Sequence, residues 1–145
     1  MREVDALDFS GKEKMRWEIE LFYSEQQDQD RYLELAPQFA EKYSMDNSTV
    51  LNSTAWAIYE MTDDKKALTK ALNFVNRSID LEADYNNLDT KMRILYVIGK
   101  KKDAIALGKE ISDMINKSEG LADQKKTHDA VVAAMKAGKN IKELD

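Results

Sequence analysis

The sequence predicts an all-α fold built from stacked helical hairpins. Residues 51–60 and 88–97 share a pattern that begins with a Leu and has a Tyr at the ninth position. Tyr59 of the first copy matches Tyr96 of the second, an offset of 37 residues. An internal repeat of this length is the signature of a helical solenoid, whose hairpins bury their apolar faces against one another. The chain also holds only one Pro and five Gly, the residue types that helix interiors exclude. At 145 residues it is long enough for one domain with a continuous core.

Seven helices are expected from the apolar periodicity and from residues that begin and end helices. Ser10 with Glu13 makes a capping box for the first helix. The carboxylates of Asp63 and Asp64 suit the N-terminus of the fourth helix, and Gly99 suits a left-handed C-cap after the fifth. The expected helices cover about residues 10–25, 28–43, 47–61, 63–80, 87–98, 101–118 and 122–136.

Three further expectations concern interruptions and ends. Pro37 falls inside the apolar stripe of the second helix, where a missing donor and a steric clash cost about 3 kcal/mol, so we expect a kink there. Gly120 is expected to stop the sixth helix and Gly138 the seventh. The tail from Gly138 to Asp145 is expected to fray, because chain ends order only when something ties them down.

The stretch from residue 88 to residue 105 has the spacing of a known repeat. Gly99 closes a first helix, and Ala104 is a small residue five positions later, where a second helix must pack closely. This pattern resembles the tetratricopeptide repeat. Residues 78–85 resemble the end of a preceding repeat, with Ala83 where the family usually has Pro. The chain also departs from the family at Lys91 and Met92.

Matching the second helices of the two repeats aligns Ala71 with Ala104, an offset of 33 residues. The first repeat is therefore expected to have a connector about four residues longer than the second. We expect one domain over residues 1–145, made of three parts. These are an N-terminal helical hairpin over 1–46, two tetratricopeptide-like repeats over 47–118, and a capping helix with a tail over 119–145.

A narrower likeness involves short runs in both repeats. These runs are Leu51-Asn52, Ala55-Trp56, Leu88-Asp89-Thr90, Gly99-Lys100 and Ala104-Ile105. Together they are similar to the helical region that follows the thioredoxin domain in some bacterial thioredoxin-like, disulfide-isomerase-like proteins. The resemblance implies a C-terminal accessory domain of a thiol–disulfide oxidoreductase whose catalytic domain is absent from this chain. Any redox activity would belong to that domain, because this chain has no Cys.

The predicted partner-binding residues lie on the first helix of each repeat, where a solenoid has its concave face. They are Asn52, Trp56 and Tyr59 in the first copy and Asp89, Arg93 and Tyr96 in the second. Trp, Tyr and Arg dominate binding hot spots, and Asn or Arg side chains can hold a peptide backbone or carboxylate. The alternative is that Trp56 and the two Tyr residues only pack against the adjoining hairpin.

No other pattern in the sequence predicts chemistry. His128 is the only His and is expected at the surface, because it is a lone histidine beside Asp129. It is not expected to bind zinc, since a zinc site needs three or four nitrogen or sulfur ligands. Asp28 and Asp30 begin a run like a calcium loop that lacks the required Gly. We therefore expect no catalytic residue, no metal and no cofactor. A small helical enzyme using carboxylates and His128 is a remote alternative.

Composition narrows the partners. The net charge is −5 and Lys and Arg form no dominant stripe, so nucleic acid is not expected. No run of about 18 apolar residues exists to span a membrane, and residues 1–20 do not form a signal peptide. The sequence thus predicts a non-catalytic protein-interaction or domain-packing module. Its partner would be a protein or peptide, or an adjoining thioredoxin-like domain. The compartment stays open between bacterial cytoplasm and periplasm, the latter if the parent chain carries a signal peptide.

Overall fold

The computed structural model describes residues 12, 16, 19 and 29–144, and within this part the chain is all-helical. Residues 29–144 form six α-helices and two short 3₁₀ helices, without a strand. Most of the first expected helix, over residues 10–25, lies outside the described residues. The helices are α3 Gln29–Tyr43, α4 Ser48–Met61, α5 Lys65–Leu81, α6 Tyr85–Val97, α7 Lys101–Lys117, η1 Glu119–Gln124, α8 Lys125–Lys136 and η2 Ile141–Leu144.

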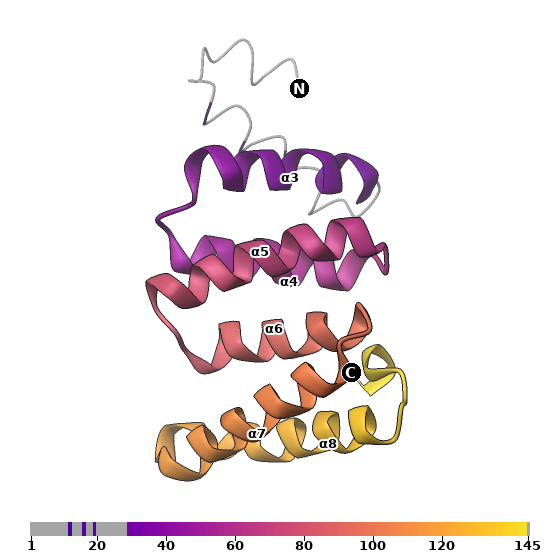
Figure 1. The fold of residues 1–145 in the computed structure, drawn as a ribbon. Coiled ribbons are helices and arrows are strands. Elements are labelled where there is room, and N and C mark those ends of the chain that lie inside the picture. Colours follow the sequence, from indigo (N-terminus) through magenta and orange to yellow (C-terminus); the bar gives the residue numbers. More distant parts are fainter. Residues whose placement is uncertain (1–11, 13–15, 17–18, 20–28, 145) are drawn as a thin grey trace.

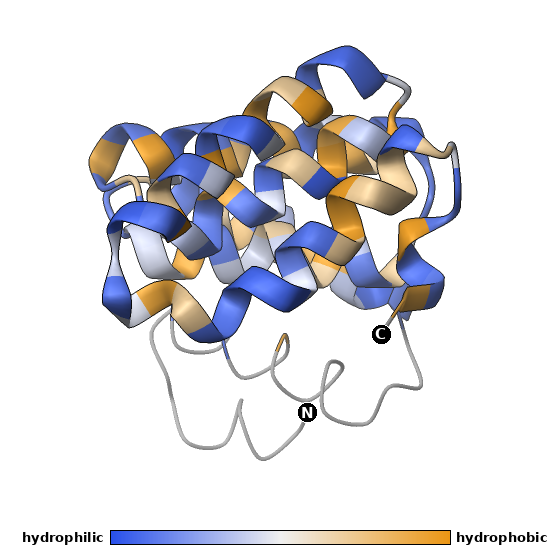
Figure 2. Ribbon diagram, turned by 90° about the horizontal axis from the view of Figure 1, so that it is seen from below, coloured by the Kyte–Doolittle hydropathy of each residue, from blue (hydrophilic) through white to orange (hydrophobic). Residues whose placement is uncertain are grey.

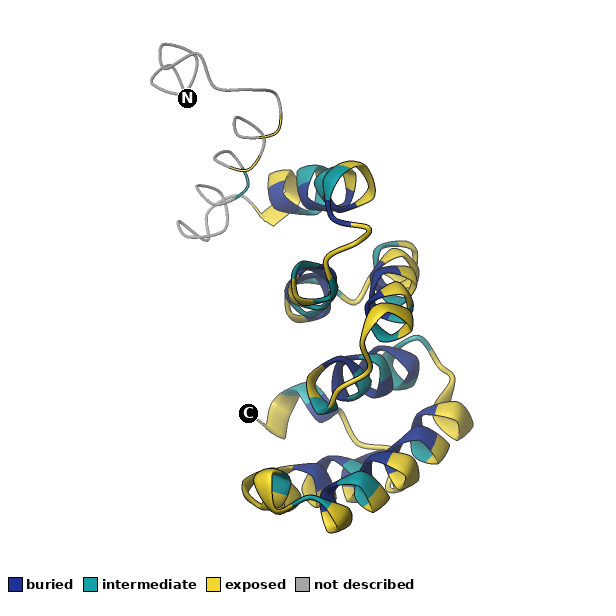
Figure 3. Cartoon of the chain, turned by 90° about the vertical axis from the view of Figure 1, so that its left-hand side faces the viewer, coloured by how far each residue is buried: buried dark blue, intermediate teal, exposed yellow. Residues whose placement is uncertain are grey.

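The helices are stacked in chain order, with α3 at one end and the α7 and α8 pair at the other (Figure 1). Helix α4 packs on α5, and α6 packs on α7. Helix α5 also packs on α6, so the two hairpins adjoin, and α4 contacts α6 directly. Each helix turns one face inward and exposes the other (Figure 3). Because α4 and α6 are neighbours, residues one repeat apart in the sequence lie on adjoining faces.

The two hairpins have connectors of equal length and second helices of equal length, which corrects one expectation. The connectors are residues 62–64 between α4 and α5 and residues 98–100 between α6 and α7, three residues in each case. Helices α5 and α7 are both 17 residues long and start at Lys65 and Lys101, an offset of 36. The expected offset of 33 and the longer first connector are therefore wrong.

The error comes from matching residue identities and ignoring buried positions. Ala71 and Ala104 look alike in sequence but occupy different positions along their helices. At the observed offset of 36, Leu68 corresponds to Ala104 and Ala71 to Leu107, and all four side chains are buried. A large and a small residue thus exchange places between the two copies. The buried volume is conserved across the pair of positions, although the residue at each position is not.

The helix starts follow local hydrogen bonds. Asn47 accepts the Val50 N–H at 3.1 Å, which caps α4. Asp64 accepts the Ala67 N–H at 3.0 Å and caps α5, confirming the expected role of its carboxylate. Helix α6 begins two residues earlier than expected. Its cap is Asp84, because Asp84 and Asn87 form a reciprocal capping box that places Asn87 inside the helix.

Glycine ends two helices in the expected way. Gly99 has a φ of +97°, and the N–H of Lys100 donates to the Leu95 carbonyl at 2.8 Å. Gly138 has a φ of +73°, with a matching bond from the Lys139 N–H to Ala134 at 2.9 Å. A left-handed residue costs little only when it is Gly, so these two positions confirm both C-caps.

The other expected interruptions have mixed outcomes. Helix α3 continues through Pro37, and the kink there stays a prediction. Helix α7 ends at Lys117, before Gly120, which lies inside η1. The expected frayed tail is wrong over residues 141–144, because these form η2 and Ile141 is completely buried. One fully buried Ile contributes about 2 kcal/mol, which is enough to hold a short segment in place.

A continuous apolar core runs from Ala40 of α3 to Ile141 of η2, and a smaller cluster lies between α3 and α4. Hydrophobic and hydrophilic residues alternate along the helices, as expected when each has one buried face (Figure 2). None of the helices that the structure describes is long and apolar enough to cross a membrane. Between α4 and α5 of the first hairpin, the Ser48 and Ser78 hydroxyls each donate to the other residue's carbonyl, at 3.0 and 2.7 Å.

Candidate functional site

The six predicted partner-binding residues lie on α4 and α6, two helices in direct contact, and their two stripes are hereafter the α4/α6 face. Direct contacts join Asp89, Arg93, Trp56 and Tyr59, whereas Asn52 and Tyr96 lie farther along the same stripes. Three side chains lie on each helix at spacings of three or four residues, which places them on one stripe of that helix. Tyr59, Asp89 and Arg93 are buried, whereas Asn52, Trp56 and Tyr96 are partly exposed. The structure therefore divides the predicted set into a buried group and a more accessible group.

Arg93 is at the centre of the buried group. Its Nε donates to Asp89 Oδ2 at 3.1 Å, and its guanidinium carbon lies 5.3 Å from the centre of the Trp56 ring. The Trp56 and Tyr59 rings are 5.1 Å apart between centroids and tilted by 34°. Arg93 is only 4% exposed, so both the cation and its carboxylate partner are largely out of water. The Arg93 guanidinium is held by Asp89 and contacts the Trp56 ring. This contact restricts the orientation of the indole.

Tyr85 lies one helical turn before Asp89 and has a perturbed ionisation. Burial raises the pKa of the Tyr85 phenol, and the negative charge of Asp89 raises this pKa further, while Arg93 acts in the opposite direction. Desolvation and a nearby carboxylate both disfavour a phenolate. The tyrosine is therefore neutral on this face at ordinary pH and serves as an apolar surface with a hydroxyl.

Asn52 carries an unsatisfied group. Its Oδ1 is buried and has no hydrogen-bond partner among the described residues. A buried acceptor in that state costs about 1–3 kcal/mol. Asn52 lies four residues before Trp56, so this cost falls at the α4/α6 face. An N–H donor brought to Asn52 would remove it.

The C-terminal segment, residues 139–144, lies across this face and was not expected there. The Tyr96 hydroxyl donates to the Lys139 carbonyl at 2.7 Å. The Lys142 ammonium lies 4.7 Å from the centre of the Tyr59 ring and donates to the Thr62 carbonyl at 3.0 Å. The segment thus reaches from α6 to the end of α4. The available sequence signal was Ile141, an apolar residue in a mostly polar tail.

His128 is buried, which corrects the expectation of a surface histidine. It is 1% exposed, and its Nε2 lies 2.9 Å from the Gly108 carbonyl and 3.0 Å from the Ser112 hydroxyl. Helices α7 and α8 approach closely here, because a Cβ on Gly108 would lie 3.1 Å from Val132 Cγ2. His128 fills this junction as a core side chain. Within the described residues, no three His, Asp or Glu side chains gather in a way that could hold a metal ion.

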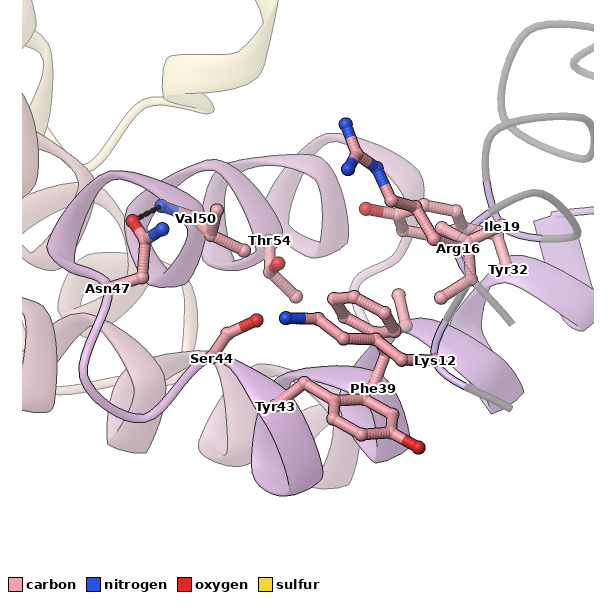
Figure 4. A pocket seen from close by; sticks show the side chains of 11 residues that line it. Lys12, Arg16, Ile19, Tyr32, Phe39, Tyr43, Ser44, Asn47, Val50 and Thr54 are labelled. Carbon is pink, nitrogen blue, oxygen red and sulfur yellow. Dashed lines mark hydrogen bonds between the residues drawn. The ribbon is translucent and has the colours of Figure 1, made fainter. Parts of the chain in front are cut away.

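A second feature, a pocket of about 430 Å³, lies between α3 and α4 (Figure 4). Aromatic rings of α3 form one wall, and Phe39 and Tyr43 pack at 5.2 Å between centroids. Lys12 and Arg16 also line the pocket, with the Lys12 ammonium 5.6 Å from the centre of the Tyr43 ring. The pocket is amphipathic and suits an apolar group with a negative end. Sequence reasoning missed it because its walls come from segments that no local pattern connects.

No family model, no curated protein and no solved structure matches this chain. The likenesses to tetratricopeptide repeats and to thioredoxin-associated helical regions therefore stay predictions.

Proposed function

We propose that this chain is a non-catalytic protein-interaction module, a tetratricopeptide-like solenoid whose α4/α6 face receives a protein partner. Support for the solenoid comes from two hairpins with equal connectors and second helices of equal length. The direct contact of α4 with α6 is the arrangement in which the first helices of successive repeats form one continuous surface. This surface would be the concave face.

One observation carries the proposal, namely the Trp56 indole held over Arg93 while remaining partly exposed. Trp and Arg are enriched at the centres of binding interfaces, and a rigid aromatic anchor loses little entropy on binding. In this arrangement Trp56 contacts the partner. Arg93, which is paired with the buried Asp89, contacts the indole and restricts its orientation. Asn52 and Tyr96, also partly exposed, flank it.

The identity of the partner has two versions. In one, the partner is a separate protein or peptide. In the other, it is a thioredoxin-like domain of the same parent chain, which the likeness of residues 51–56 and 88–105 supports. A Cys-x-x-Cys motif encoded upstream of Met1 in the same reading frame would favour the second version, and a stop codon there would favour the first.

The test is photo-crosslinking from a position beside the anchor. Thr49 is exposed and lies two helical turns before Trp56, so a photoreactive residue there would face an occupant of the α4/α6 face. Lys70 is exposed on α5 and serves as the matched control position. In lysate of the source cells, we expect a discrete crosslinked protein from position 49 that is absent from position 70.

The same crosslink should disappear when Trp56→Ala is added, while the far-ultraviolet circular dichroism spectrum stays helical. A crosslink that survives Trp56→Ala, or the same products from both positions, would contradict the proposal. Trp56→Ala is preferred to Arg93→Ala for this test, because removing the buried Arg93 leaves Asp89 without its cation.

A further inference from the structure

We infer that residues 139–144 form an intramolecular stand-in for the partner, and that the α4/α6 face takes a peptide segment with an aliphatic residue followed by lysine. This inference rests on the proposed function and names the chemistry of the ligand. The chain itself supplies the example, since its own segment contacts two of the six candidate residues, Tyr59 and Tyr96.

The binding site of the Lys142 ammonium, hereafter the lysine seat, is the most specific contact of residues 139–144. Lys142 Nζ donates to the Thr62 carbonyl at 3.0 Å and to Asp63 Oδ1 at 2.7 Å, and it lies over the Tyr59 ring at 4.7 Å. A backbone carbonyl at the end of a helix, a carboxylate and the face of an aromatic ring each attract a cation. Their convergence on one ammonium selects a positively charged side chain at this position.

The other two contacts set the spacing of the ligand. Ile141, directly before the lysine, is completely buried and belongs to the main core. Two residues earlier, the carbonyl of Lys139 accepts the Tyr96 hydroxyl at 2.7 Å. A fitting segment therefore presents a backbone carbonyl, one free position, an aliphatic side chain and a lysine in that order.

The segment is built to be released without unfolding the helices. It leaves α8 at Gly138, whose φ of +73° ends the helix and separates the two elements. Lys139, Asn140, Glu143 and Leu144 are all exposed, so the anchorage depends on Ile141, the Lys142 ammonium and one carbonyl. Asp63 is itself 80% exposed at its side chain, so its ion pair is open to water and to competition. Segments with so few buried contacts open at the low end of the local stability range.

Covalent attachment gives this segment a high effective concentration at its seat, so a free peptide of the same sequence competes poorly with it. Weakening the attached copy should therefore strengthen binding of a free copy. The Lys142→Glu variant of the full chain does this by placing a carboxylate against Asp63. Lys139→Glu is the matched control, because it makes the same charge change in the same segment at an exposed side chain.

The experiment measures fluorescence anisotropy of a labelled synthetic peptide with the sequence of residues 137–144, titrated with each full-length protein. We expect binding to the Lys142→Glu protein to be about tenfold tighter than to the wild type or to the Lys139→Glu protein. The peptide carrying Ile141→Asp should not bind. A peptide carrying Lys142→Glu should regain binding to the Asp63→Lys protein, in which the new lysine repels the attached Lys142 and attracts the glutamate of the peptide.

Three results would overturn the inference. One is a Lys142→Glu protein that is folded by circular dichroism and does not bind the peptide. Another is equal binding to the Lys142→Glu and Lys139→Glu proteins. The third is a wild-type dimer in analytical ultracentrifugation that Lys142→Glu converts to a monomer, since the seat would then belong to a second copy of this chain.

The crosslinking assay distinguishes this inference from the proposed function. In the Lys142→Glu protein, a partner crosslink from position 49 that excess peptide does not reduce would leave the proposed function standing and contradict the inference about residues 139–144. Peptide binding with the expected pattern, but no partner crosslink, would support the seat and contradict the broader proposal.

Discussion

The guanidinium of Arg93 lies over the indole of Trp56, 5.3 Å from the ring centre, and joins helix α6 to helix α4 through a charge that is almost entirely buried. Asp89 holds that charge from one turn away on the same helix. A cation in such a place is stable only while its carboxylate stays paired with it. The accessible part of the face thus depends on a buried pair beneath it.

Removing either member of the Arg93–Asp89 pair should therefore destabilise the chain more than removing both. We expect Arg93→Leu and Asp89→Leu each to lower the free energy of unfolding by about 3–5 kcal/mol, because each breaks the ion pair that a largely buried charge makes with its neighbour. The double variant should recover part of that loss. Urea unfolding of all four proteins gives the coupling energy. Additive losses would show that the two side chains do not act as a pair.

Asn87 should be the most sensitive polar residue at the hairpin junction. Its side-chain amide donates to the Ser78 hydroxyl at 3.1 Å and to the Glu82 carbonyl at 2.8 Å, and its oxygen accepts the Asp84 N–H. Asn87→Ala should cost about 3 kcal/mol, since it removes three hydrogen bonds made by a side chain that is almost completely buried. The exposed neighbour Asn86 is the control, and Asn86→Ala should change stability by less than about 0.5 kcal/mol. Similar losses from the two variants would contradict this role.

Gly99 and Gly120 should respond in opposite directions to the same substitution. Gly99 has a φ of +97°, where a Cβ is strained although space is free, so Gly99→Ala should cost about 1–2 kcal/mol. Gly120 has no such backbone angle, and its nearest neighbour to an added Cβ lies at 3.8 Å. Gly120→Ala should be neutral or stabilise by about 0.5 kcal/mol through the unfolded state. Thermal unfolding midpoints of the two variants test the difference.

Tyr85 should make stability depend on pH in the alkaline range. The pKa of the Tyr85 phenol in the folded chain is raised above that of an ordinary tyrosine, chiefly by burial and then by the negative charge of Asp89. A raised pKa means that the folded state holds the proton more tightly, so the associated stability is complete below the unfolded pKa. It is lost as pH rises through the folded pKa. Tyr85→Phe removes this contribution while keeping the ring.

The measurement is the free energy of unfolding of wild type and Tyr85→Phe at about pH 8 and about pH 11. Lysines titrate in the same range, so the informative quantity is the difference between the two proteins. Wild type should lose more stability than Tyr85→Phe over this interval. Equal losses would mean that the Tyr85 phenol is not perturbed by folding.

Local features were the most predictable from sequence. Asp64 as an N-cap and Gly99 and Gly138 as C-caps follow from the residue's own donors, acceptors or backbone freedom, and all three are confirmed. Helix α6 was placed two residues late because Asp84 and Asn87 share the capping role, and sequence alone does not say which of two polar residues is outside the helix.

Features that depend on packing were less predictable. The expected offset between α5 and α7 was wrong because Leu68 occupies the position equivalent to Ala104, and Ala71 the position equivalent to Leu107. All four residues are buried, so only the packed core shows that a large and a small side chain have exchanged positions. His128 was expected at the surface because its polarity favours water. It is buried because the Gly108 carbonyl and the Ser112 hydroxyl lie within hydrogen-bonding distance of its Nε2 across the α7–α8 junction.

The sequence by itself determined that this chain is helical, where most of its helices begin and end, and which six residues share one face of α4 and α6. Those properties depend on spacings of three or four residues, which a helix converts directly into position. Only the tertiary structure decided that Arg93 and Tyr59 are buried and that residues 139–144 lie across the α4/α6 face. Contacts such as that between Lys142 and Thr62 join segments separated by 80 positions in the chain, and no local pattern encodes them.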